Sequence, residues 1–259
     1  MSVLTDLAAA LTDGSVRVVD LTQPLGPSTP ILLLPEPFAN TPTFELHEIS
    51  RYDDRGPAWY WNWFKTGEHT GTHFDAPIHW ITGSEDGDSV DQVPPGRLVG
   101  PAVVLDHSAE VADNPDFLLE IDHIKAFEAE HGALPEGGWL LYRTGWDARA
   151  HDQDAFLNAD DTGPHTPGIS VDCAQWLATE APIVGVGVET VGTDAGAAHS
   201  FDPAFPCHGF MLGAGKYGLT QLANLDQLPP TGAVLVASPL KITGGSGSPT
   251  RVLALVSNG

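Results

Sequence analysis

One window of the chain reads His69-Thr-Gly-Thr-His73-Phe-Asp75-Ala-Pro-Ile-His79. It collects three of the eleven histidines and one aspartate. His69, His73 and Asp75 are separated by even numbers of residues, so a fully extended backbone would direct all three side chains to one face of a sheet. Two imidazoles and a carboxylate are typical ligands of a divalent cation. We therefore predict that His69, His73 and Asp75 bind a metal ion.

A helix would also bring His69 and His73 together, as a pair four residues apart. However, the window contains several residues that disfavour a helix, namely Thr70, Gly71, Thr72, Asp75 and Pro77. We therefore expect a strand, or a strand that turns into a loop. Gly71 would then let the backbone approach the site closely. Thr70 and Thr72 have two open roles, either orienting the imidazoles by hydrogen bonds or simply occupying the strand.

His79 lies beyond Pro77, which interrupts strand pairing and turns the chain. A hydrolytic metal site keeps one coordination position open for water or a substrate carbonyl, and three protein ligands satisfy that need. We expect His79 to lie beside the open position without being a ligand. Because an imidazole can take a proton from an attacking water and return it to a leaving nitrogen, His79 is the predicted catalytic residue.

Tryptophans are concentrated just before this window. Residues 57–64, Pro-Ala-Trp-Tyr-Trp-Asn-Trp-Phe, hold three of the seven in the chain. Such a density suits the wall of a pocket for a flat aromatic ligand, although core packing is the commoner use of these side chains. We predict that Trp59, from this segment, and Trp80, next to His79, contact the substrate.

Motifs of other chemistries are weak or missing in the sequence. There is no Gly-x-Ser-x-Gly elbow of a serine hydrolase. The glycines of residues 212–218 lack the spacing of a phosphate loop, and those of residues 185–192 lack the spacing of a dinucleotide site. Cys207 is next to His208, but neighbours in sequence rarely present their side chains to one another productively. A metal-dependent hydrolase remains the best supported class.

The composition excludes several kinds of partner. Eleven Lys and Arg against 34 Asp and Glu give a formal charge of -23, which would repel nucleic acid and anionic membrane surfaces. A solvated surface is the simplest explanation of this acidity. No stretch approaches the apolar length of a membrane span, and two cysteines are compatible with a reducing compartment. We expect a cytoplasmic protein without nucleic-acid or membrane partners.

The hydropathy pattern predicts strands with interspersed helices. Strands are predicted at residues 16–22, 44–51, 60–66, 102–106, 139–144, 183–188, 233–237 and 251–256. Helices are predicted at residues 4–11, 121–131 and 170–180, the last with Ser170 as its N-cap. This order indicates one α/β domain, residues 1–259, with a mixed sheet. Residues 23–43 (Gln23 to Thr43) are long for a connector and form an active-site lid, a dimer-contacting arm or a structural wrapping loop.

The window of residues 69–79 matches the complete motif His-x-Gly-Thr-His-x-Asp-x-Pro-x-His. On these residues the chain resembles the metal-dependent cyclase-like hydrolases, which include bacterial kynurenine formamidases and isatin hydrolases. Further stretches resemble the isatin hydrolases in particular: Arg55-Gly-Pro-Ala-Trp-Tyr-Trp-Asn62, Arg143-Thr-Gly-Trp-Asp147, Gly192-Thr-Asp-Ala-Gly196, Leu222-Ala-Asn-Leu-Asp226 and Pro239-Leu-Lys-Ile242. The resemblance implies a swivelling β/α/β domain with a mixed sheet, usually as a homodimer.

The resemblance also implies roles for single residues. His69, His73 and Asp75 would bind one divalent ion, Mn²⁺ in the first place and Zn²⁺ as an alternative, and His79 would be the proton donor and acceptor. His208 would face the substrate. Where formamidases of this superfamily have a glutamate that binds a second metal, this chain has Thr220 with Gln221 beside it, which favours one metal. Gln221 also stands where isatin hydrolase has a serine near its proton path.

We therefore expect a manganese-dependent hydrolase that opens the cyclic amide of isatin to isatinate through metal-activated water. The nearest alternative is an arylformamidase acting on N-formylkynurenine, or another cyclic imide or amide hydrolase. An alternative of another class is a noncatalytic protein that binds a metal or a ligand. For the enzymes, the expected partner is a small aromatic amide.

Overall fold

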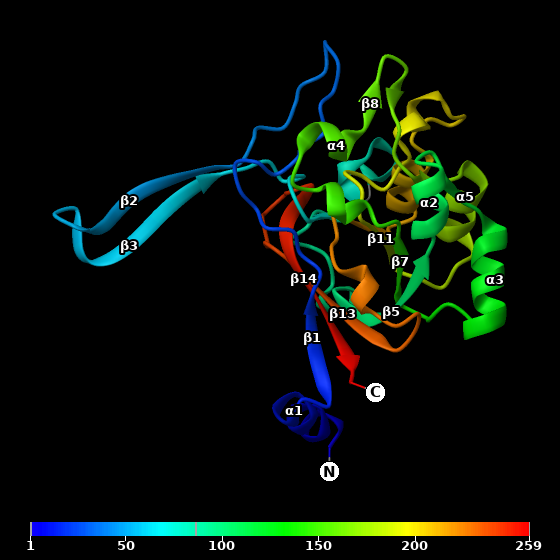
Figure 1. The fold of residues 1–259 in the computed structure, drawn as a ribbon, viewed down its shortest axis with the longest axis horizontal. Coiled ribbons are helices and arrows are strands. Elements are labelled where there is room, and N and C mark those ends of the chain that lie inside the picture. The colour runs from blue at the N-terminus through cyan, green and yellow to red at the C-terminus, as the bar shows by residue number, and fades with distance from the viewer. Residues whose placement is uncertain (1, 86, 259) are drawn as a thin grey trace.

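A mixed sheet of eight strands forms the centre of the protein in the computed structural model, which describes residues 2–85 and 87–258 (Figure 1). Its strand order is β1-β14-β13-β5-β7-β11-β12-β4, and β14 also pairs with β4, so the strands from β14 to β4 form a closed ring. The central four are parallel and the remaining pairings are antiparallel. The strands span β1 (Val16–Asp20), β4 (His73–Asp75), β5 (Val99–Asp106), β7 (Trp139–Arg143), β11 (Gly185–Val188), β12 (Tyr217–Thr220), β13 (Ala233–Pro239) and β14 (Gly247–Ser257).

The central strands bury both of their faces. On β7, Trp139 and Leu141 join the core inside the ring, whereas Leu140 and Tyr142 join a second core outside it. Continuous apolar sequence is typical of parallel strands that are covered on both sides. The outer core is covered by helices α3 (Ile121–His131) and α5 (Val171–Thr179), with α2 (Ser108–Asp113) nearby (Figure 1). The predicted N-cap of α5 is confirmed, because the Ser170 side chain accepts a hydrogen bond from the backbone N–H of Cys173.

Strands β2 (Glu45–Asp53) and β3 (Gly56–Lys65) form a separate antiparallel hairpin that projects from the body (Figure 1). Its large apolar side chains are exposed, and they comprise Leu46, Tyr52, Trp59, Tyr60, Trp61, Trp63 and Phe64. A single two-stranded hairpin is marginally stable in water, and a concentration of exposed apolar residues marks an interaction surface. We call this element the arm.

Residues 23–43 form the strap, an irregular segment fastened to the body near its middle. The side-chain amide of Gln153 pairs with the backbone of Ile31 in both directions, at 2.9 Å and 2.8 Å. The side-chain amide of Gln221 donates a hydrogen bond to the carbonyl oxygen of Pro30 at 3.2 Å. The strap is therefore a covering segment held against the body, and the projecting arm is a different element.

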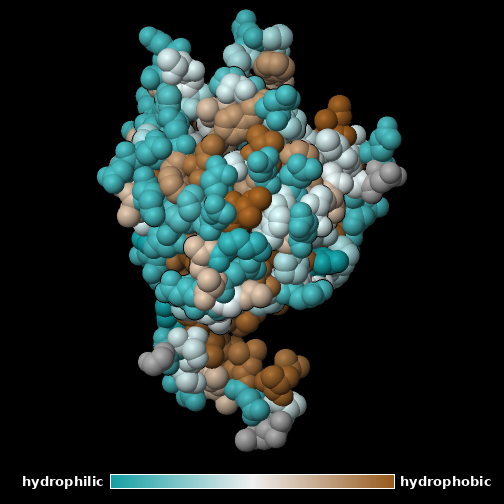
Figure 2. Space-filling view, turned by 90° about the vertical axis from the view of Figure 1, so that its right-hand side faces the viewer, coloured by the Kyte–Doolittle hydropathy of each residue, from teal (hydrophilic) through white to brown (hydrophobic). Residues whose placement is uncertain are grey.

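Helix α1 (Val3–Asp13) begins at the N-cap Ser2 and ends at Gly14, whose φ is 80°. It lies at the far end of β1, and Figure 2 shows its apolar side chains at the tip of the projection below the body. Val3 and Leu4 are 79% and 72% exposed. In residues 2–85 and 87–258, no helix combines the length and the hydropathy that a membrane crossing requires.

Candidate active site

The window of residues 69–79 passes from a turn into a short central strand. His73 and Asp75 are buried on β4, between β12 and β14, whereas His69 lies in the turn that precedes it. Gly71 in that turn has a φ of 66°, a conformation that side chains disfavour, and a Cβ atom there would lie 3.1 Å from Leu25 of the strap. The strand prediction is confirmed for residues 73–75 alone. The turn, and not side-chain alternation along a strand, brings His69 to the site. Gly71 lets the backbone approach the strap, whereas we expected it to let the backbone approach the site.

Four side chains of the window converge. Nδ1 of His69 lies 2.8 Å from Oδ1 of Asp75, and Nε2 of His73 lies 3.4 Å from the same oxygen. The His79 ring stacks on the His69 ring with centroids 3.7 Å apart. His69, Asp75 and His79 each offer a ligand atom within 4.8 Å of the others. The structure thus brings together all four residues predicted for the centre. The group whose ligand atoms lie within 4.8 Å of one another includes His79, predicted not to be a ligand, in place of the predicted ligand His73.

Hydrogen bonds orient the two imidazoles predicted as ligands. Nδ1 of His73 lies 2.7 Å from the carbonyl oxygen of Gly71, so a proton on Nδ1 leaves the Nε2 lone pair directed at Asp75. Nε2 of His69 lies 2.9 Å from Oγ of Ser246, whose hydroxyl donates to Glu68 at 2.6 Å. Each ring therefore turns one nitrogen toward the Asp75 carboxylate. Two nitrogens and a carboxylate oxygen fit a divalent first-row metal ion.

In the described part of the chain, neither Thr70 nor Thr72 forms a hydrogen bond to an imidazole, so of their two open roles the orientation of the rings is not observed. Thr72 donates to the carbonyl oxygen of Gln221 at 2.6 Å, and the nearest hydroxyl to Thr70 is that of Thr41, at 3.4 Å. Thr220, from a different strand, contacts the His73 imidazole, because its Oγ1 lies 2.8 Å from Nδ1 of His73. β12 places it there, since Thr220 is directly opposite His73 in the strand register.

The charges of the centre are set by burial and by the histidines. Burial alone would raise the pKa of Asp75, but His73 and His69 in their protonated forms hold this pKa well below its ordinary value, and a cation bound between the neutral rings would act in the same direction. The carboxylate is therefore ionised and able to bind a cation. Burial lowers the pKa of His79 to about 3, so its ring is neutral at neutral pH.

His208 faces this centre from the π-helical turn His208–Leu212. Its ring lies 5.7 Å from that of His79 and 4.9 Å from that of Trp80. Asp194, which sequence reasoning missed, lies 2.5 Å from Nδ1 of His208 and accepts the backbone N–H of Cys207 at 2.7 Å. Burial alone would lower the pKa of His208, but the hydrogen bond with Asp194 raises it. The stretch Gly192-Thr-Asp-Ala-Gly196 was the only sequence signal for Asp194.

The two predicted substrate tryptophans lie in different places. Trp80 contacts the centre, with its ring 6.2 Å from that of His79 and 5.6 Å from that of Phe205. Trp59 lies on the arm and is 49% exposed, so within one chain it is away from this site. Its role in substrate binding stays a prediction.

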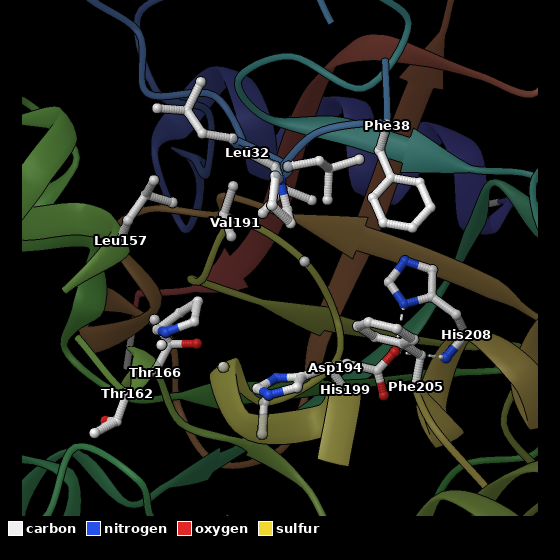
Figure 3. Close-up of a pocket in the computed structure, with 18 residues that line it drawn as sticks. Leu32, Phe38, Leu157, Thr162, Thr166, Val191, Asp194, His199, Phe205 and His208 are labelled. Atoms are coloured by element: carbon white, nitrogen blue, oxygen red, sulfur yellow. Dashed lines mark hydrogen bonds and ion pairs between the residues drawn. The ribbon is translucent and has the colours of Figure 1, made fainter. Parts of the chain in front are cut away.

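A cavity of about 560 Å³ opens beside His208 (Figure 3). Its lining comes from the strap, from the loop after β11 and from the segment around β8 (Ala159–Asp160) and β9 (Gly163–Pro164). Apolar side chains predominate, among them Leu32, Leu33, Leu34, Phe38, Leu157, Val191 and Phe205. A pocket of this kind next to convergent polar groups is the usual form of a small-molecule site.

Comparison with known proteins places the centre in a family. Residues 19–195 match a protein family described as "Putative cyclase", and this match contains the whole 69–79 window. The chain belongs to this cyclase family. Within the family, it is 54% identical over 257 residues to an isatin hydrolase of Roseibium aggregatum, covering 98% of this chain and 97% of that protein. It is 31% identical over 191 residues to a kynurenine formamidase of Salinibacter ruber, covering 71% and 74%.

Solved structures of cyclase-family proteins have the same fold. Isatin hydrolase A from Ralstonia solanacearum superposes with a TM-score of 0.97 at 54% identity, covering 99% of this chain and 98% of that one. An isatin hydrolase bound to the product analogue thioisatinate superposes with a TM-score of 0.96 at 53% identity, covering 100% of both chains. The predicted resemblance and the predicted mixed α/β fold are confirmed.

Proposed function

We propose that this cyclase-family protein is a metal-dependent hydrolase that opens the lactam ring of isatin to isatinate. The observation that carries the proposal is the convergence of His69, His73 and Asp75, with the His79 ring stacked 3.7 Å from that of His69. The identity of 54% to an isatin hydrolase, over nearly the whole chain, supports the choice of substrate. The cavity beside His208 offers the apolar walls that a flat aromatic ring requires.

One divalent ion held by His69, His73 and Asp75 is part of this proposal, Mn²⁺ in the first place and Zn²⁺ as an alternative. When bound, such an ion polarises an amide carbonyl and lowers the pKa of water. Thr220 supports a single ion. Its hydroxyl contacts His73, and it offers no carboxylate to a second cation.

The side chains around the centre have separate roles in proton transfer and in substrate binding. Neutral His79 accepts a proton from the attacking water while the water oxygen bonds to the lactam carbon. As the carbon–nitrogen bond breaks, His79 returns that proton to the aryl nitrogen, which leaves as an aryl amine. The second proton of the water passes from the new carboxylic acid to solvent, so the other product is a carboxylate. Asp194 fixes the His208 ring, whose Nε2 is directed to the centre and is placed to donate a hydrogen bond to a substrate oxygen. Trp80 and Phe205 hold the aromatic ring.

We further propose that two copies associate through the arm as a homodimer. Trp59, Trp61 and Trp63 are 49%, 54% and 50% exposed. Tryptophan is enriched among the residues that contribute most to protein–protein binding, so this exposed group favours an interface. In such a dimer the aromatic face of the arm would be covered by the second copy, and Trp59 would meet that copy. The single domain over residues 1–259 and the cytoplasmic location stay predictions.

The test of the activity begins with elemental analysis of gently purified protein. The protein is then reconstituted with Mn²⁺ or with Zn²⁺ and assayed in parallel on isatin and N-formylkynurenine. We expect turnover of isatin with Mn²⁺. A clear preference for N-formylkynurenine would show that isatin is not the preferred substrate.

The variant His79→Ala separates an enzyme from a binding protein. An enzyme should retain its metal and lose about 10²- to 10⁴-fold in turnover, the usual contribution of a general acid–base. A noncatalytic binder would be little altered in its metal and ligand affinities. The exposed His151 offers a matched control in the variant His151→Ala.

A further inference from the structure

The cavity beside His208 meets the candidate active site at one of its two ends. Figure 3 shows His208, Phe205 and Phe38 on one side of the cavity and Leu157 and Thr162 on the other. We call these sides the near end and the far end. A substrate whose carbonyl group meets the metal-binding residues must enter at the near end, so its opposite edge points toward the far end.

The apolar wall over the cavity is fixed in place. Leu32, Leu33 and Leu34 of the strap line the cavity directly after Ile31, which Gln153 holds by two hydrogen bonds. The next turn of the strap is closed by Asn40, whose side chain accepts from the N–H of Leu34 at 2.6 Å and donates to its carbonyl oxygen at 3.1 Å. These bonds hold the leucines over the cavity, so the far end is preformed.

The far end has no carboxylate, lysine or arginine among its described lining residues, and it reaches the surface. Among the lining residues that the structure describes, Asp194 is the only carboxylate, and it lies at the near end paired with His208. Leu157 and Thr166 form the far wall, while Thr162 and His199 are exposed at the rim. An apolar group fits this wall without leaving a charge unpaired, and its tip can approach solvent.

We propose that the far end is a second subsite, and that the protein accepts isatins whose aromatic ring carries an apolar substituent on the edge remote from the carbonyls. This inference rests on the proposed function and extends its substrate class. Cavities of about 300–1,000 Å³ enclose drug-sized ligands, and the two fused rings of isatin fill only part of about 560 Å³. A substituent that covers Leu157 and the strap leucines removes further apolar surface from water.

The test compares isatin with 5-phenylisatin on the full, manganese-loaded protein. We expect kcat/KM for 5-phenylisatin to equal or exceed that for isatin. The variant Leu157→Trp fills the far end and should lower the ratio of kcat/KM for 5-phenylisatin to kcat/KM for isatin at least about tenfold. Leu11→Trp, on the exposed face of α1, is the matched control. Should Leu157→Trp fold poorly, Thr162→Trp blocks the same end from an exposed position.

Two outcomes would overturn the subsite. One is a wild-type kcat/KM lower for 5-phenylisatin than for isatin, and the other is a ratio of the two that neither far-end variant lowers. If isatin itself is not hydrolysed, the proposed function fails, and calorimetric titration with isatinate and 5-phenylisatinate tests the subsite separately. Tighter binding of the phenyl compound that is lost in Leu157→Trp supports the subsite, and equal binding of the two compounds refutes it.

Discussion

Oδ2 of Asp194 lies 2.5 Å from Nδ1 of His208, and the backbone N–H groups of Cys207 and His208 donate to the same carboxylate. These donors fix Asp194, which in turn fixes the ring so that its Nε2 lies 3.9 Å from Asp75. Asp194 is therefore a positioning residue. We predict that Asp194→Asn lowers kcat/KM about 10- to 100-fold, the usual effect of removing such a partner, while the metal content is unchanged.

The pH profile of kcat/KM separates positioning from general damage. Because the Asp194 carboxylate raises the pKa of His208, the variant should shift the limb of the profile that reports His208 to lower pH. Asp226→Asn, at an exposed position, is the control. An unshifted profile with full activity in Asp194→Asn would contradict the role.

Ser246 connects His69 to Glu68, and its removal should weaken metal binding. We predict that Ser246→Ala lowers metal affinity about 10- to 100-fold, because the His69 ring loses the hydrogen bond that orients it. Competition with a chelator of known affinity measures the change. Ser257→Ala, at the exposed end of β14, should bind metal like the wild type. Equal affinities in the two variants would show that Ser246 does not orient the ligand.

Glu189 makes stability depend on pH. Burial, with the nearby charge of Asp147, raises the pKa of Glu189 from 4.5 to about 7. A raised pKa means that the folded protein binds the proton more tightly than the unfolded chain does. The free energy of unfolding should therefore fall by up to about 3 kcal/mol as pH rises from about 4.5 to about 7.

The variant Glu189→Gln should remove this dependence, because a neutral amide can still accept from Thr144 and Trp146, as the carboxyl group does. Urea unfolding of both proteins with chelator present, at several pH values, measures the difference. Glu180→Gln, at an exposed position, should retain the wild-type slope. A slope that survives in Glu189→Gln would mean that other groups cause it.

The arm should control association. We predict that Trp61→Ser with Trp63→Ser raises the dimer dissociation constant at least about 30-fold, since a buried tryptophan anchor often contributes 2 kcal/mol or more. Analytical ultracentrifugation over a concentration series measures this constant. Leu4→Ser removes an even more exposed apolar residue, from α1, and should leave the dimer intact. A wild-type monomer at all concentrations would refute the dimer.

The sequence of a segment predicts its own secondary structure better than it predicts which distant residues the segment contacts. The apolar run of β7 and the serine before α5 specify a buried strand and a helix start, and both are present. The contacts of Asp194, Ser246 and Thr220 depend on strand register and on turns from distant segments, which local patterns do not encode. The convergence of the four motif residues could be predicted because one short window contains all of them.

The aromatic segment shows the limit of composition. The tryptophans of residues 57–64 suggested a pocket wall, but they lie on a hairpin whose place relative to the body is not determined by its own alternation pattern. Residues 23–43 are the opposite case. Their lack of periodicity leaves their role open, yet they contribute to the cavity wall. The leucines of this strap line the cavity, and hydrogen bonds from Gln153 and Gln221 hold it there.

The pairing of β14 with β4 has a consequence for biosynthesis. β14 lies opposite His73 and Asp75 through Pro249 and Gly247, and Ser246, just before it, contacts His69 across 177 positions of sequence. A nascent chain emerges from the ribosome with its amino-terminal part first, so residues 69–79 lack their β14 contacts until β14 has left the ribosome. Loading of the proposed cation would thereby be delayed to a late stage, and ribosome-bound chains halted before residue 246 should not retain it.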